Sequence, residues 1–100
     1  MKNYTSERAM AEMRGLILDR LYRSFPVPAA RPAVLQELRP SFSTQTEEWL
    51  NDAMSEQLKV LAYAGLIKTA AKGFTLTSRG MDDRRQAARF LNKTTPPDAA

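Results

Sequence analysis

The sequence predicts a single, mainly α-helical domain with a small β-hairpin, in the order helix, helix, helix, strand, strand, helix. Two observations lead to this fold class. Apolar residues recur at helical spacing in three successive segments. Residues 65–80 then have the pattern of a helix end, a strand, a tight turn, a second strand and a new helix start. The chain of 100 residues has the length of one domain. We expect the domain at residues 6–92, between a flexible N-terminus at 1–5 and a disordered tail at 93–100.

Composition excludes several classes of function. The chain has no cysteine and no histidine, which argues against zinc fingers, thiol chemistry and the commonest general base. It also has no Gly-x-Ser-x-Gly motif and no glycine-rich phosphate loop, so we expect neither an enzyme nor a cofactor. No apolar run is long enough to span a membrane, and residues 1–7 do not resemble a signal peptide, which favours a cytoplasmic protein. The net charge of +4 favours acidic partners, nucleic acid among them.

The first predicted helix precedes a helix-turn-helix, and the second predicted helix is its first part. Residues 6–24 carry an apolar stripe that includes Met13, Ile17 and Leu21, and Pro26 stops this helix. A short helix then starts near Arg31, with a proline at its first position, and ends at a second proline, residue 40. Its inner face consists of Val34, Leu35 and Leu38.

The third predicted helix begins at a capping box, in which Thr44 is followed three residues later by Glu47. A turn at residues 41–43 separates it from the second helix, so the two form the helix-turn-helix. Gly65 ends the third helix, because a left-handed residue is needed there and glycine adopts it at least cost.

The hairpin is predicted from two short strands, residues 66–71 and 74–77, joined by a two-residue turn at Lys72 and Gly73. The glycine supplies the positive φ angle of such a turn. Thr77 or Ser78 then caps a last helix that we expect to run to about residue 92.

The end of the third helix and the hairpin resemble winged helix-turn-helix regulators, in particular the PadR-like and MarR-like transcription factors. The matching residues are Leu58, Leu61, Gly65-Leu66-Ile67 and Phe74-Thr75-Leu76-Thr77-Ser78-Arg79-Gly80. The resemblance implies a winged-helix fold and a small DNA-binding regulator of transcription. It also implies a homodimer through the long first and last helices. The matching residues are core, turn and cap residues, so they bear on the fold and not on DNA contacts.

Charge is distributed unevenly along the chain. Residues 44–64, which include the predicted recognition helix, carry four acidic side chains and one lysine, a net charge of −3. Residues 65–93 carry seven basic and two acidic side chains, a net charge of +5. A recognition helix in the major groove lies beside phosphates, and contacts to phosphates depend on Lys and Arg. The excess positive charge therefore lies outside the helix that would read the bases.

Three interpretations of the third helix stay open: base recognition, a solvated acidic face on a structural helix, and a surface that docks a basic protein partner. For binding to double-stranded DNA, the candidate residues on the third helix, the hairpin and the last helix are Gln45, Thr46, Asn51, Lys59, Lys68, Lys72, Arg79, Arg84 and Arg85. For a protein partner, the candidate face is Glu48, Asp52 and Glu56.

Overall fold

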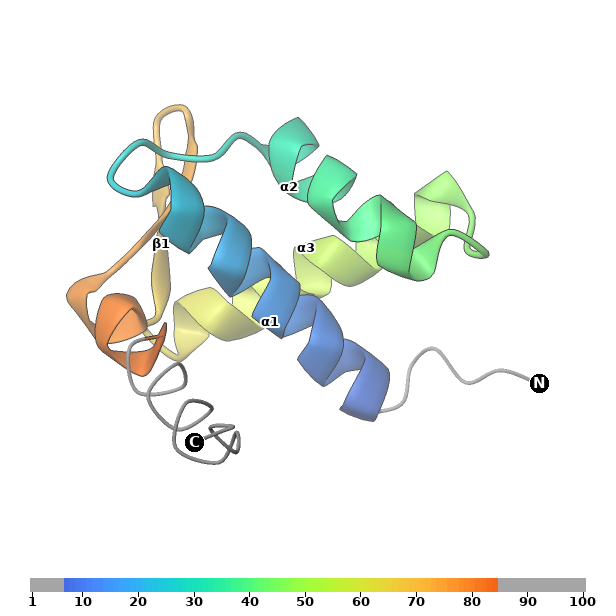
Figure 1. The fold of residues 1–100 in the computed structure, drawn as a ribbon, viewed down its shortest axis with the longest axis horizontal. Helices are drawn as coiled ribbons and strands as arrows, with labels where there is room; N and C mark the ends of the chain where they lie inside the picture. The colour runs from blue at the N-terminus through green and yellow to red at the C-terminus, as the bar shows by residue number, and fades with distance from the viewer. Residues whose placement is uncertain (1–6, 85–100) are drawn as a thin grey trace, which may run out of the picture.

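The computed structural model describes residues 7–84. Its elements are α1 (Glu7–Ser24), α2 (Arg31–Leu38), the short 3-10 helix η1 (Arg39–Phe42), α3 (Glu47–Tyr63), β1 (Ile67–Ala70) and β2 (Gly73–Leu76). Residues 78–84 are helical and follow the hairpin (Figure 1). The prediction of a mainly helical fold with a small antiparallel hairpin is confirmed. The predicted N-terminus at 1–5, the tail at 93–100 and the end of the last helix near residue 92 lie outside the described residues.

Helix α1 buries the predicted stripe. Met13 and Ile17 are fully buried, and Leu18 and Leu21 are nearly so. Figure 1 shows α1 crossing α3, with α2 beside them and the hairpin at one end of the three helices. The core lies between these elements and also receives Ile67 and Leu76 from the two strands.

The connection from α2 to α3 differs from the predicted turn. The α-helix ends at Leu38, but the chain continues as η1, with Pro40 in the first turn of that helix. A proline is tolerated there because its missing amide has no helical partner in a first turn. Phe42, which the sequence predicts in a turn, is buried, and its ring centroid lies 6.0 Å from that of Trp49.

Helix α3 begins two residues later than predicted. The N-cap is Thr46 and not Thr44, and its hydroxyl accepts a hydrogen bond from the Trp49 amide at 3.0 Å. The carboxylate of Glu47 pairs with Arg39 at 2.6 Å instead of closing a capping box. The chain can enter the helix late because η1 uses residues up to Phe42.

Helix α3 ends as predicted at Gly65, which has a φ of 80°. The Gly65 amide donates to the Ala62 carbonyl and the Leu66 amide donates to the Leu61 carbonyl, each at 3.0 Å. This paired arrangement is a Schellman motif, which satisfies two of the carbonyls left over at the helix end.

The hairpin pairs Ile67 with Leu76 and Ala70 with Gly73. Its turn lies at residues 71–72, one residue before the predicted position, and Gly73 belongs to β2. The glycine is still required. A Cβ atom at this position would lie 2.2 Å from the Ala29 carbonyl oxygen, and its φ of 151° is strained for other residues.

A third backbone segment joins the sheet, which the sequence does not predict. Ala29, in the connection between α1 and α2, forms an antiparallel bridge with Phe74. Each of the two amides donates to the carbonyl of the other residue at 2.9 Å. The bridge fixes the hairpin against the start of α2 (Figure 1).

Thr77 caps the helix at residues 78–84, as one of the two predicted alternatives. Its hydroxyl accepts a hydrogen bond from the Gly80 amide at 3.1 Å and donates to the Gly65 carbonyl at 2.6 Å. Gly80 packs so closely on the Leu66 carbonyl that a Cβ atom would lie 2.1 Å from its oxygen. Among residues 7–84, no helix is long and apolar enough to cross a bilayer.

Candidate nucleic-acid interface

A groove of about 280 Å³ lies between α3 and the hairpin. We call it the α3–hairpin groove. Its lining residues are Arg31, Ser55, Leu58, Lys59, Ala62, Ile67, Thr69 and Phe74. Two of these side chains are cationic and none is acidic, so the groove is an electropositive hollow beside an otherwise acidic helix.

Arg31 ties the start of α2 to this side of α3. Its guanidinium donates to the Asn51 side-chain oxygen at 3.3 Å, to the Asn51 carbonyl at 3.4 Å, and to the hydroxyl of Ser55. The residue is exposed, so the rest of its planar donor set still faces solvent. The contact brings a cation onto the polar side chains of α3, including the candidate Asn51.

Sequence reasoning did not select Arg31 as a site residue. Its only local signal is its position immediately before a helix-starting proline, which says nothing of its neighbours in space. The two contacts reach 20 and 24 residues along the chain, so they depend on how α2 packs on α3.

The hairpin sends its candidate residues to two different sides. Lys68 pairs with Thr75 across the strands, and Thr69 pairs with Phe74. Because successive side chains of a strand point to opposite faces, Thr69 and Phe74 line the α3–hairpin groove whereas Lys68 lies on the other face of the sheet. The structure therefore does not bring Lys68 together with Lys59.

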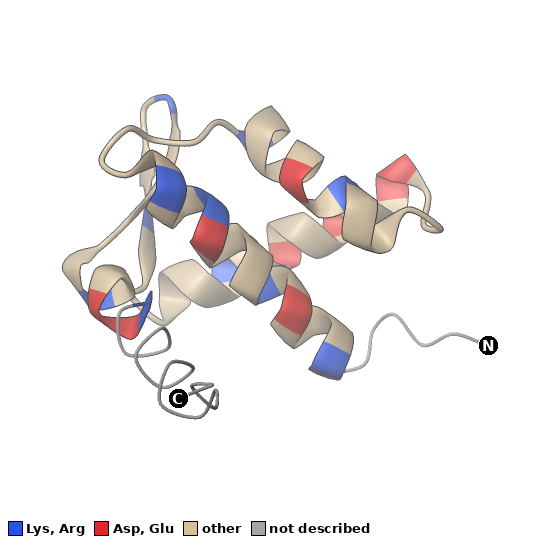
Figure 2. Cartoon of the chain, viewed as in Figure 1, with Lys and Arg blue, Asp and Glu red and all other residues tan. Residues whose placement is uncertain are grey.

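The remaining basic candidates have different surroundings. Lys72 is exposed in the hairpin turn, and Figure 2 shows a basic residue at that tip. Arg79 is exposed and lies near Gly65, at the base of the hairpin. Arg84 pairs with Asp19 at 3.0 Å, and its guanidinium lies 5.2 Å from the centre of the Tyr22 ring, so it joins the last helix to α1. Arg85 lies outside the described residues.

Gln45 and Thr46 lie at the N-terminus of α3. Gln45 is half-buried, and its backbone amide donates to the Phe42 carbonyl at 3.0 Å. The Thr46 hydroxyl oxygen already accepts the Trp49 amide. This contact gives Thr46 a structural role at the start of the helix.

The acidic candidates form a separate surface on α3. Glu48, Asp52 and Glu56 are all exposed and are spaced four residues apart, so they share one side of the helix. None of the three has an ion pair within residues 7–84. Acidic segments along α3 are visible in Figure 2. We call these three residues the acidic face.

Ion pairs elsewhere occupy many of the arginines of the helical body. The Arg23 guanidinium pairs with Glu37 at 2.5 Å and with Asp19 at 3.0 Å. The hydrogen bonds that it donates to these carboxylates, above all to Glu37, raise the pKa of Arg23. Arg14 pairs with Glu7. Within the described part of the chain, the basic residues without an ion pair are Arg8, Arg20, Arg31, Lys59, Lys68, Lys72 and Arg79. Five of these seven belong to the α3–hairpin end of the domain.

Two broader observations complete the description. Within residues 7–84, no group of three or more acidic side chains is arranged to hold a metal ion. Comparison with protein-family models, with curated proteins and with solved structures gave no match, so the interface is interpreted from the chain's own geometry.

Proposed function

We propose that this chain is a winged helix-turn-helix protein that binds double-stranded DNA with α3 and the hairpin, as a small regulator of transcription. The order of the described elements supports the fold: three helices, an antiparallel hairpin and a further helical segment. In such a domain α3 enters the major groove and the hairpin lies against the adjacent backbone.

The observation that carries the proposal is the concentration of cations without an acidic partner at the α3–hairpin end. Arg31 and Lys59 line the groove beside α3, Lys72 lies at the hairpin tip, and Arg79 lies at the hairpin base. A lysine or arginine side chain without an internal ion pair can bind a phosphate without first breaking a salt bridge. Asn51 and Ser55 supply hydrogen-bonding groups between these cations, at positions where base edges are read.

The acidic face limits how α3 meets the duplex. Glu48, Asp52 and Glu56 repel phosphates, although an acidic side chain accepts well from cytosine. The proposed docking therefore turns the Arg31 side of α3 toward the backbone and leaves the acidic face over the open major groove. Affinity in this arrangement is modest and depends strongly on salt.

A fluorescence anisotropy titration with random-sequence duplex tests the proposal. If each of the four cations named above contacts one phosphate, affinity should fall about 150-fold between 50 and 200 mM monovalent salt. Absence of salt-sensitive binding even at micromolar protein and low salt would overturn the proposal.

The proposal includes a homodimer formed through α1 and the last helix. At the C-terminal end of α1, Tyr22 is 41 % exposed, and Phe25 and Val27 follow it with 42 % and 65 % exposed. Large exposed apolar side chains of this kind are enriched at protein interfaces. Sedimentation equilibrium measures the oligomeric state directly. A homodimer would bind two DNA half-sites, and a monomer at high concentration would contradict that model.

A second candidate function rests on one exposed aromatic residue. Tyr63 is 96 % exposed at the end of α3, on the same side of the helix as Asp52 and Glu56. An exposed tyrosine beside carboxylates is typical of a surface that docks a basic protein. A partner captured by the native protein should then be lost with the E48K/D52K/E56K variant and with Tyr63→Ala, and its retention by both would exclude this surface.

A further inference from the structure

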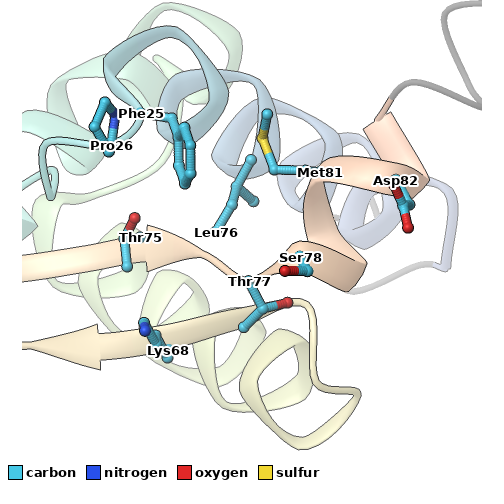
Figure 3. A pocket seen from close by; sticks show the side chains of 9 residues that line it. All are labelled: Phe25, Pro26, Lys68, Thr75, Leu76, Thr77, Ser78, Met81 and Asp82. Atoms are coloured by element: carbon cyan, nitrogen blue, oxygen red, sulfur yellow. The ribbon is translucent and has the colours of Figure 1, made fainter.

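A second hollow lies on the other face of the hairpin (Figure 3). It has a volume of about 620 Å³ and is bounded by the connection after α1 and, far along the chain from it, by the two strands and the start of the last helix that follows them. Its lining residues are Phe25, Pro26, Lys68, Thr75, Leu76, Thr77, Ser78, Met81 and Asp82. This volume is in the range of small-molecule sites.

The hollow has an apolar wall, a polar end at the strands, and further polar groups toward the last helix. Phe25, Leu76 and Met81 come from three different segments and form its apolar wall, as Figure 3 shows. Lys68 and Thr75, which are cross-strand neighbours, form the polar end. A ligand that fits the apolar wall and the polar end is amphipathic.

Thr75 supplies a hydroxyl that opens into the hollow. The residue is only 7 % exposed, but its oxygen is not a buried atom left without a partner, since within residues 7–84 the atom of that kind is Arg84 Nε. In Figure 3 the hydroxyl oxygen points across the hollow toward Phe25 and Pro26. The Thr77 hydroxyl differs, because it both donates and accepts within the protein, whereas that of Thr75 stays available to a ligand.

The positive charge of Lys68 makes the polar end favour an anionic group of a ligand. Its side chain is exposed at the rim and has no ion pair within the described residues. Asp82 lies on the last helix, away from the strands, as Figure 3 shows. An anionic group is therefore attracted to the strand side of the hollow.

We propose that this hollow binds a small amphipathic carboxylate. The carboxylate accepts hydrogen bonds from the Lys68 ammonium and the Thr75 hydroxyl, and the apolar body packs on Phe25, Leu76 and Met81. The site is separate from the α3–hairpin groove, and its ligand binding does not depend on DNA binding.

Methionine methyl signals make the test specific to this site. The full chain is labelled with ¹³C at its methionine methyl groups and titrated with octanoate or benzoate. Met81, at the hollow, should shift with saturation, whereas the fully buried Met13 and Met54 should not. The two acids distinguish a chain-like from a ring-like ligand. Octanamide, which has the same chain and no charge, should bind at least about tenfold more weakly than octanoate.

Three variants assign the polar end. Lys68→Met should weaken binding of the preferred acid about tenfold, and Thr75→Val should weaken it about threefold or more. Lys72→Met, on the same hairpin but outside the lining, is the matched control and should leave binding unchanged. Unshifted Met13 and Met54 signals verify that each variant is folded.

The proposal is overturned by any of three results. These are a Met81 signal that neither acid moves, equal binding of octanoate and octanamide, and a folded Lys68→Met variant that binds as tightly as the native protein.

Discussion

The two sides of α3 differ in their neighbours and in their charge. On the side toward α2 and the hairpin, Asn51 and Ser55 are bound by Arg31, and Lys59 lines the same groove. On the outer side, Glu48 and Asp52 are exposed and have no ion pair within the described residues. One helix therefore presents a cationic side and an anionic side, although four of its five charged residues are acidic.

The net charge of a helix therefore does not describe the electrostatic potential at either of its sides. Side chains rotate by about 100° per residue, so neighbours in sequence face different surroundings. On one side of α3, an arginine from another element adds to the positive charge of Lys59.

The largest effect should come from Gly80, because its contact with Leu66 holds the hairpin beside α3. An alanine Cβ would lie 2.1 Å from the Leu66 carbonyl oxygen, so the last helix or the hairpin must move. We expect Gly80→Ala to lower the free energy of unfolding by about 3 kcal/mol. Urea unfolding followed by circular dichroism measures this change.

Gly15→Ala is the matched control. Gly15 lies in α1, and no atom lies within 4 Å of an added Cβ. Alanine is the better helix former, so this variant should gain about 0.5–1 kcal/mol. If Gly80→Ala were as stable as Gly15→Ala, the close packing of Gly80 on the Leu66 carbonyl would be contradicted.

The next effect concerns the cationic side of α3. Arg31→Ala removes a charge and the fork that binds Asn51 and Ser55, so DNA affinity should fall about tenfold and the salt slope by about one. Arg31→Lys keeps the positive charge but loses the planar guanidinium donors. Its DNA affinity should lie between those of the native protein and the Arg31→Ala variant. Arg20→Ala on α1, which also has no ion pair within residues 7–84, is the control and should change affinity less than twofold.

These titrations have an informative opposite outcome. If Arg31→Ala and Arg20→Ala weakened DNA binding equally, binding would depend on total charge, and the two sides of α3 would not differ in function.

The smallest effect concerns where α3 begins, which decides how its acidic first turn is placed. Thr46→Ala removes the hydroxyl that accepts the Trp49 amide and should cost about 1 kcal/mol. Thr46→Ser keeps an acceptor and should cost much less. Equal thermal unfolding midpoints for the alanine and serine variants would count against Thr46 as the cap.

Local patterns were sufficient to predict most of the fold. The stripe of α1, the inner face of α2 and the glycine after α3 depend on residues within one or two turns of each other, and each is confirmed. The hairpin, and the cap that Thr77 forms on the helix after it, also follow from neighbouring residues.

The errors and omissions have non-local causes. Thr44 and Thr46 are both acceptable caps in sequence, and the choice between them depends on η1 and on Phe42 packing against Trp49. The bridge between Ala29 and Phe74 joins residues 45 positions apart, so no short pattern indicates it. The candidate site has the same limit, because its cationic character depends on Arg31 reaching α3.

The hairpin is fastened at both of its ends. At the base, the Thr77 amide donates to the Leu66 carbonyl at 3.0 Å, and at the other end Ala29 bridges Phe74 next to the turn. An isolated two-stranded hairpin opens readily in water. This one has no free end from which to fray, so it should open only when the helices separate. Its amide protons should then exchange with solvent at the rate of the α3 core, as part of one cooperative unit.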